Sequence, residues 1–292
     1  MRTALFSCLV CLVVTITNAQ SSSGSITGRL SSPELKEISG MAPSARHPGL
    51  FYVHNDSGDP ARFFAVTPKG KLVATYYFID GDHSSINVKD CEDIACGPGP
   101  AKGEHYIYLA DIGDNIGWRN TVKLYRFKEP GTTRIVDTVS ATTFTLQYPD
   151  GPRDAETLMV DPIDKMIYIL SKREDSVGIY GFSLNSSNAS TIVMQSFGKL
   201  FFPGKRKDKW VLSGDISANG KEVLVKTSNS VYFFNRKSTE PIYKTLRRVP
   251  VQQKKFKPHG QQEAIAFAPG NKGYYVMAEG KNSPVYYFSL EQ

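Results

Sequence analysis

Long apolar runs are rare in this sequence. The run from Ala4 to Ile16 is shorter than the about 20 residues that a membrane-spanning helix needs, so we expect no membrane span. It follows Arg2 and leads into small residues up to Ala19, which is the pattern of a secretory signal peptide. We therefore predict a signal peptide at residues 1–19 and a secreted, extracellular chain over residues 20–292.

Cysteine is also scarce, with four residues in the whole chain. Cys8 and Cys11 belong to the predicted signal peptide, which leaves Cys91 and Cys96. In an oxidising compartment we expect these two to form one local disulfide bond, and two buried free thiols are the alternative. No histidine pair at zinc-ligand spacing lies near them, which argues against a zinc site.

Recognised catalytic motifs are missing. The sequence contains neither GxSxG nor HExxH, and its five histidines are scattered, which argues against a protease or a lipase. No series of Asp-box motifs occurs, so a glycosidase using a pair of carboxylates is a third candidate at best. No nucleic-acid-binding module is recognisable, and we expect no nucleic acid partner.

The charge balance is moderately basic, with a formal net charge of +7. Basic residues concentrate at residues 204–210, at Lys244, Arg247 and Arg248, and at residues 254–257. Such clusters attract anionic glycans, phosphorylated small molecules or other anionic surfaces. An ordinary solvated face is the alternative interpretation.

Three sequons for N-glycosylation fit a secreted chain. They begin at Asn55, Asn185 and Asn188. Asn185 and Asn188 lie in a Ser/Asn-rich segment and are the predicted glycosylation sites, because Asn55 lies inside a tight, turn-rich motif.

Short β-branched and aromatic runs dominate from Ile26 onward, and no stretch has a long helical apolar period. The runs recur as a unit with an acid before an aliphatic residue, then a turn, an apolar strand, and a strand with an aromatic pair. Five copies begin at Glu37, Glu92, Glu156, Asp215 and Glu263. A further strand-like run follows each of the first four copies, at residues 72–79, 142–148, 190–197 and 242–249.

This repeat predicts an all-β fold, a β-propeller of five four-stranded blades in a single domain over residues 20–292. Six blades are the alternative, if a long interval contains a degenerate blade. The fifth copy ends at Leu290 without a fourth strand, while residues 25–30 belong to no copy. We predict that these two ends pair, because closing the ring removes exposed strand edges.

Acidic residues should gather at one mouth of the central channel. The first strand of each blade lines the channel and the second returns antiparallel to it, so the first begins where the second ends. Crowded carboxylates repel one another unless a cation compensates them, and Ca²⁺ accepts six to eight oxygen ligands in a flexible geometry. The predicted calcium ligands are Glu37, Glu92, Glu156, Asp215, Glu263, Asp111 and Asp114. The alternative is that these acids cap turns or accept hydrogen bonds between blades.

Two lysines occupy second-strand ends in other copies, Lys172 and Lys226. A lysine beside a bound cation is a common arrangement for binding phosphate, because both neutralise its oxygens. We predict that this pair binds an anion or phosphate, and a salt bridge to the acids is the alternative.

The succession EISGMA, LFYVHNDSGDP, DCEDIA, YLADIGDN, YPDGPRDAETLMVDP and YILSKRE resembles a family of secreted propeller proteins called phytase-like, or esterase-like-of-phytase. The resemblance covers roughly residues 37–174. β-Propeller phytases are six-bladed calcium enzymes, so the resemblance implies a calcium role for Glu92, Asp93, Asp111, Asp114 and Glu156. Secreted calcium-activated nucleotidases, with five blades and a central calcium, are similar in architecture alone.

Two functions follow from these features. The first is a calcium-binding extracellular binding or matrix protein, with matrix components or anionic glycans as partners and calcified tissue as a candidate setting. The alternative is a calcium-dependent phosphohydrolase, phytase-like or nucleotidase-like, in which metal-activated water attacks phosphorus. Fold alone does not decide between them.

Overall fold

The structure is a computed structural model that describes residues 24–255 and 261–290. The predicted signal peptide lies outside the described residues. The described chain is all-β, with one short α-helix, α1 (Ile242–Leu246), and two 3₁₀ turns. Within this part of the chain, no helix is long and apolar enough to cross a membrane.

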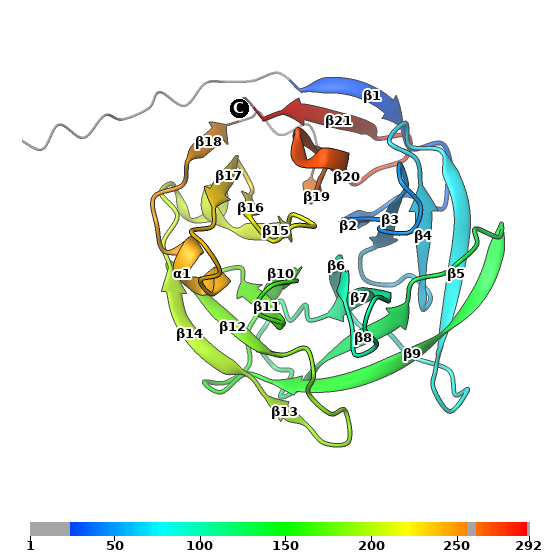
Figure 1. Cartoon of the computed structure of the whole chain (residues 1–292), viewed down its shortest axis with the longest axis horizontal. Helices are drawn as coiled ribbons and strands as arrows, with labels where there is room; N and C mark the ends of the chain where they lie inside the picture. Colours follow the sequence, from blue (N-terminus) through cyan, green and yellow to red (C-terminus); the bar gives the residue numbers. More distant parts are fainter. Residues whose placement is uncertain (1–23, 256–260, 291–292) are drawn as a thin grey trace, which may run out of the picture.

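Five strands surround the centre of the molecule (Figure 1). They are β2 (Ile38–Pro43), β6 (Cys91–Pro98), β10 (Ala155–Val160), β15 (Val211–Ile216) and β19 (Gln262–Phe267). Each packs against the next, and β19 packs against β2, so that the ring is closed. These are the first strands of the five predicted copies, and the arrangement resembles that of propeller-fold proteins.

From each inner strand, consecutive strands pair antiparallel toward the outside. The strands that follow β2 are β3 (Phe51–Asn55), β4 (Arg62–Val66) and β5 (Leu72–Asp80), and those that follow β6 are β7 (His105–Asp111), β8 (Val122–Lys128) and β9 (Val136–Gln147). Those that follow β10 are β11 (Met166–Ser171), β12 (Val177–Ser183) and β14 (Gln195–Leu200). Those that follow β15 are β16 (Glu222–Thr227), β17 (Ser230–Asn235) and β18 (Gln252–Lys255), and those that follow β19 are β20 (Gly273–Ala278) and β21 (Pro284–Ser289).

The first two units are fused at their outer edge. The first half of β9 pairs parallel with β5, from Thr75↔Val136 to Asp80↔Ala141, and its second half pairs antiparallel with β8. The short β13 (Ile192–Val193) also joins β9. Together these strands form one nine-stranded sheet beside three four-stranded sheets.

The N-terminal strand β1 (Ser25–Arg29) completes the last sheet. It pairs antiparallel with β21, from Ser25↔Tyr287 to Arg29↔Pro284, and the Thr27 hydroxyl donates to the Pro68 carbonyl at 2.7 Å. The pairing predicted for the two unmatched ends is therefore confirmed. A cluster that includes Ile38 of β2 and Met277 of β20 fills the space between the first and last sheets.

One predicted outer strand, residues 242–249, is wrong. This segment begins with helix α1, and β18 supplies the fourth strand of its sheet instead. Pro241 directly precedes the helix, where its fixed φ is compatible with a helix start. Ile242 and Leu246 are four residues apart and both buried, so they lie on the same side of the helix.

The predicted disulfide bond is also wrong, because Cys91 and Cys96 are free thiols. Both lie on β6, opposite Asp111 and Ile107 respectively. An extended strand rises about 3.3 Å per residue, which separates the two far beyond the roughly 7 Å that a disulfide can span. Burial raises the pKa of both thiols well above the usual range.

Candidate functional site

The inner hairpins share a register shift at their open end. In each, one residue near the start of the first strand is passed over in the pairing with the second strand, which is the pattern of a β-bulge. The five equivalent residues are Ser39, Glu92, Glu156, Leu212 and Glu263. Three of the predicted acids, Glu92, Glu156 and Glu263, therefore occupy the same structural position.

The other two leading acids are offset. Glu37 lies two residues before its bulge position, and its side chain is 45% exposed and 3.4 Å from the Lys36 ammonium. Asp215 lies three residues beyond its bulge position, opposite Leu224 inside the sheet. Its Oδ2 accepts a hydrogen bond of 2.8 Å from the Phe267 amide. The structure thus places Glu37 on the rim and Asp215 within the ring.

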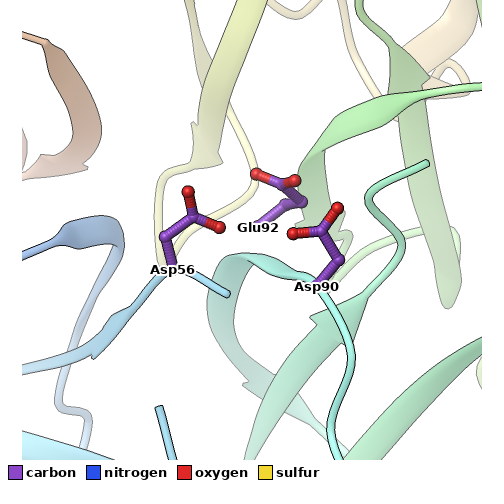
Figure 2. A group of neighbouring side chains, drawn as sticks. All are labelled: Asp56, Asp90 and Glu92. Atoms are coloured by element: carbon purple, nitrogen blue, oxygen red, sulfur yellow. The ribbon is translucent and has the colours of Figure 1, made fainter. Parts of the chain in front are cut away.

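Carboxylates gather at the mouth where the inner strands begin. Among the described residues, three groups have ligand atoms within 4.8 Å of one another: Asp56, Asp90 and Glu92; Asp56, Glu263 and Glu279; and Glu92, Asp154 and Glu156. Figure 2 shows the first group, with the three carboxylates turned toward a common space. Asp56 and Glu92 each belong to two groups, so the seven residues form one continuous arc. We call this arc the acidic mouth.

Crowding and burial disturb the ionisation of this arc. Burial, and then the neighbouring carboxylates, raise the pKa of Asp90 to about 6 and that of Glu279 to about 7. The same causes raise the pKa of Asp56 and, more strongly, that of Glu92. Negative charge is therefore unfavourable here without a compensating cation.

One sector of the mouth is different. At β15 the bulge residue is Leu212. Two residues earlier, three cations lie over the Trp210 ring: the Arg173 guanidinium at 4.7 Å, the Lys172 ammonium at 5.5 Å and the Lys207 ammonium at 6.0 Å from its centre. Lys172 also forms an ion pair with Glu156. Arg173 forms one with Asp154. The group containing Glu156 is thus already partly neutralised.

The two predicted anion-binding lysines do not come together at one surface. Lys172 follows β11 and reaches the mouth, whereas Lys226 lies within β16 and is fully buried. The Lys226 ammonium donates to the Thr227 carbonyl at 3.2 Å. Burial lowers the pKa of Lys226 to about 7, although Glu263 acts in the opposite direction.

Asp111 and Asp114 hold the loops that support the mouth. Asp111 accepts hydrogen bonds from the Lys89 and Asp90 amides at 3.1 and 3.2 Å, and its carboxylate is 2.7 Å from the Arg119 guanidinium. Asp114 accepts from the amides of Trp118 and Arg119 at 2.9 and 2.8 Å. Neither belongs to a carboxylate group of the mouth.

Asp93 is buried between inner strands. Its Oδ2 accepts from the Leu158 amide at 2.9 Å, and its Oδ1 accepts from the Ser213 hydroxyl at 3.2 Å. Of the calcium ligands that the phytase-like resemblance implies, the mouth therefore contains Glu92 and Glu156.

Sequence reasoning missed Asp90 and Asp154. Each stands two residues before a bulge glutamate, in the matching segments Asp90-Cys91-Glu92 and Asp154-Ala155-Glu156. Because side chains alternate along a strand, acids two residues apart tend to lie on one side of it. The repeated D-x-E pattern was the available signal. Asp56 and Glu279, which also contribute, directly follow β3 and β20.

A glycine leaves room for the first carboxylate group. A Cβ at Gly113 would lie 2.2 Å from Glu92 Oε1 and 2.4 Å from Asp90 Oδ2. Those distances are far below van der Waals contact, so this loop approaches the carboxylates closely because residue 113 has no side chain.

The predicted glycosylation sites lie away from the mouth. Asn185 and Asn188 are exposed in the segment between β12 and β13. Asn55 is buried, and its amide group donates to the Glu34 carbonyl at 2.8 Å and accepts from the Glu37 amide at 3.2 Å.

No protein-family model matches the chain, and comparison with curated proteins gives no match. Solved structures with a similar arrangement include a putative 6-phosphogluconolactonase from Bacteroides uniformis ATCC 8492, at 15% identity and a TM-score of 0.44, over 90% of this chain and 70% of that one. A functionally unknown protein from Desulfotomaculum acetoxidans DSM 771 has 14% identity and a TM-score of 0.41, over 85% and 71%. A luciferin-regenerating enzyme has 12% identity and a TM-score of 0.46, over 88% and 93%.

Proposed function

We propose that this chain is a secreted, five-bladed, calcium-binding β-propeller that acts as an extracellular binding or matrix protein. The observation that carries the proposal is the acidic mouth, in which three overlapping carboxylate groups meet at one end of the ring. The blade count rests on the five inner strands, each of which begins one unit of antiparallel strands.

The donor set favours a hard cation. The mouth offers carboxylate oxygens, and Ca²⁺ binds six to eight oxygens in variable geometry, whereas Mg²⁺ requires a near-ideal octahedron and Zn²⁺ prefers nitrogen and sulfur. Asp56, Asp90 and Glu92 are the favoured ligands (Figure 2). Among the described residues, their group has no direct ion pair like that between Lys172 and Glu156 in the neighbouring group.

A binding role is favoured over the phosphohydrolase that the phytase-like resemblance suggests. Besides a metal ion, catalysis on a phosphate ester is helped by cationic side chains that can reach the developing negative charge. Lys172 is engaged by Glu156, and Lys226 is buried within its sheet. Matrix components or anionic glycans that approach the calcium-loaded mouth or the basic clusters are the proposed partners.

Thermal unfolding in EDTA and in millimolar calcium tests the calcium site. A ligand at about 100 times its Kd adds roughly 2.7 kcal/mol, which for a chain of this size raises Tm by about 5–10 °C. Asp56→Asn should lose most of this increase because Asp56 belongs to two groups. Asp82→Asn, on an exposed loop, is the matched control and should keep it. Equal calcium responses in wild type and Asp56→Asn would contradict the site.

Gly113→Ala provides a second test without removing any carboxylate. The added methyl group would displace Glu92 and Asp90, so the calcium-induced rise in Tm should fall by at least half. Gly131→Ala is the control, since a Cβ there meets only Arg46 Nη1 at 4.0 Å. A full calcium response in Gly113→Ala would exclude these two acids as ligands.

An activity screen separates the binding protein from the phosphohydrolase. The calcium-loaded protein should release no phosphate from phytate, nucleotides or simple phosphate monoesters above the rate of an Asp56→Asn sample. Calcium-dependent turnover that Asp56→Asn and Lys172→Gln both abolish would support the enzyme instead.

A further inference from the structure

A pocket lies on the outside of the ring and shares no lining residue with the acidic mouth. It has a volume of about 520 Å³, within the range of small-molecule sites. Its lining residues come from β14 and the segment after it, from β17 and β18, and from the end of α1 and the segment that follows it. These elements lie at the outside of the ring (Figure 1). The lining residues include Leu200, Phe202, Tyr232, Arg247, Arg248 and Val249.

The pocket is apolar in its depth and at part of its rim. Leu200, Phe202 and Tyr232 are all buried, and the Phe202 and Tyr232 rings pack with centres 4.8 Å apart. Two large apolar side chains at the opening are exposed, Phe201 by 68% and Val249 by 89%. Covering water-exposed apolar groups beside a preformed cavity with an apolar ligand lowers the free energy, so these side chains favour binding of such a ligand.

Three cationic side chains belong to the lining of the pocket. Arg247 donates to the Phe197 carbonyl, and its guanidinium lies 5.6 Å from the centre of the Tyr243 ring, which fixes it at the edge of the pocket. Arg248 pairs with Glu240 through one nitrogen. Its Nη1 is shielded from water and has no acceptor in the described part of the chain. A guanidinium nitrogen in that state favours an anionic acceptor.

Charge and shape together specify the ligand class. Lys199, Arg247 and Arg248 contribute three positive charges to the lining, whereas no acid belongs to the lining among the described residues. An apolar cavity with cations at one side fits a molecule with an apolar tail and a single anionic head.

We propose that this pocket binds a monomeric amphiphilic anion, a carboxylate or sulfate carried on an apolar chain, as in a free fatty acid. The tail lies against Leu200, Phe202 and Tyr232, and the head meets Arg248 and Arg247. The site is separate from the acidic mouth and does not depend on calcium.

Isothermal titration with three probes tests this assignment, in EDTA so that calcium does not precipitate the ligand. Dodecanoate below its critical micelle concentration should bind one to one. Dodecyltrimethylammonium has an apolar chain of nearly the same length and the opposite charge, and it should bind at least about tenfold more weakly. Acetate, the head without the tail, should give no measurable binding. Equal affinity for the two dodecyl probes, or no binding of dodecanoate, would overturn the proposal.

Two variants that each replace an exposed valine by aspartate, one at the rim of the pocket and one outside it, provide a matched comparison. Val249→Asp should weaken dodecanoate binding by about tenfold or more, because it puts a carboxylate beside the head group. Val193→Asp, at an exposed valine of β13 outside the pocket, should bind as wild type does. If Val249→Asp does not fold by circular dichroism, Arg247→Gln at an exposed position takes its place with the same expectation. Unchanged affinity in the folded variant contradicts the site.

A membrane surface is the competing ligand source. Flotation with phosphatidylserine vesicles should recover little of the protein. Vesicle binding by a protein that fails to bind monomeric dodecanoate would overturn the proposal in favour of a lipid surface.

Discussion

Asp93 and Asp215 are buried carboxylates that connect neighbouring inner strands. Asp93 accepts from the Leu158 amide of β10, and Asp215 accepts from the Phe267 amide of β19. In both cases a side chain satisfies a backbone donor of the next strand in the ring, which otherwise would be buried without a partner. An acid inside an inner strand thus holds the ring together, whereas an acid at its start points into the mouth.

Asp215→Ala should lower the free energy of unfolding by about 1–3 kcal/mol at pH 5, because it leaves the Phe267 amide without an acceptor. Burial raises the pKa of Asp215 to about 7, above its value in the unfolded chain. The stability that Asp215 contributes is therefore full below about pH 4 and is lost as the pH rises through about 7.

The cost of Asp215→Ala should accordingly be smaller at pH 8 than at pH 5. Urea unfolding of both proteins at the two pH values measures it. A cost that grows with pH would mean that the Asp215 carboxylate is stabilised by a charge partner rather than disfavoured by burial.

At the scale of elements, β1 closes the ring and contacts the first sheet. A Cβ on Gly28 would lie 2.1 Å from the Lys69 carbonyl oxygen, so β1 and the turn after β4 approach more closely than any side chain permits. Gly28→Ala should destabilise the protein by roughly 1–3 kcal/mol, as overpacking does.

Thermal unfolding of Gly28→Ala against Gly81→Ala tests the role of this closure. Gly81 is the control because an added Cβ would meet only the Ala141 carbonyl, at 3.5 Å. A Tm for Gly28→Ala equal to that of the control would show that β1 can move aside without loss.

The inner elements could be predicted from the sequence, and the outer ones less well. Inner strands such as β10 and β19 are buried along their whole length. In β6, β10 and β19 a recognisable acid stands at the second position, whereas in β15 the acid is the fifth of six residues. Outer segments are half exposed and their patterns are weaker. Residues 242–249 contain β-branched residues that favour a strand, but they follow Pro241, which is compatible with a helix start. Tertiary packing of Ile242, Thr245 and Leu246 stabilises the helix instead. The parallel pairing of β5 with β9 joins two copies, which a repeat pattern within one copy does not indicate.

At the scale of the whole molecule, ring closure produces the acidic mouth. Asp56 and Glu279 are 223 positions apart in the numbering, yet each has a carboxylate oxygen within 4.8 Å of a carboxylate oxygen of Glu263. The sequence indicated that acids would converge, but not how deep each would lie. Glu92 occupies the bulge position of its strand, whereas Glu37 lies two residues before that position and Asp215 three residues beyond it. The position of an acid relative to the bulge decides whether its side chain lies on the rim, in the mouth or inside the ring, and the repeat pattern does not indicate where the bulge falls.

If the mouth binds calcium as proposed, that binding should depend on pH. Asp90, with a pKa of about 6, and Glu279, with a pKa of about 7, have values raised above those of the unfolded chain. Without calcium, their contribution to stability is full below about pH 4 and is lost as the pH rises through about 6 to 7. Asp215 acts in the same direction. In EDTA, Tm should therefore be lower at pH 8 than at pH 5.

Added calcium should oppose this loss of Tm at high pH, because it binds the ionised carboxylates and competes with protons for them. The rise in Tm on adding millimolar calcium should be several degrees larger at pH 8 than at pH 5, measured by differential scanning calorimetry. In Asp56→Asn the calcium rise should be small at both pH values, while the Asp215 contribution to the EDTA trend persists. A calcium response that is the same at both pH values would separate cation binding from these carboxylates and place the cation elsewhere on the chain.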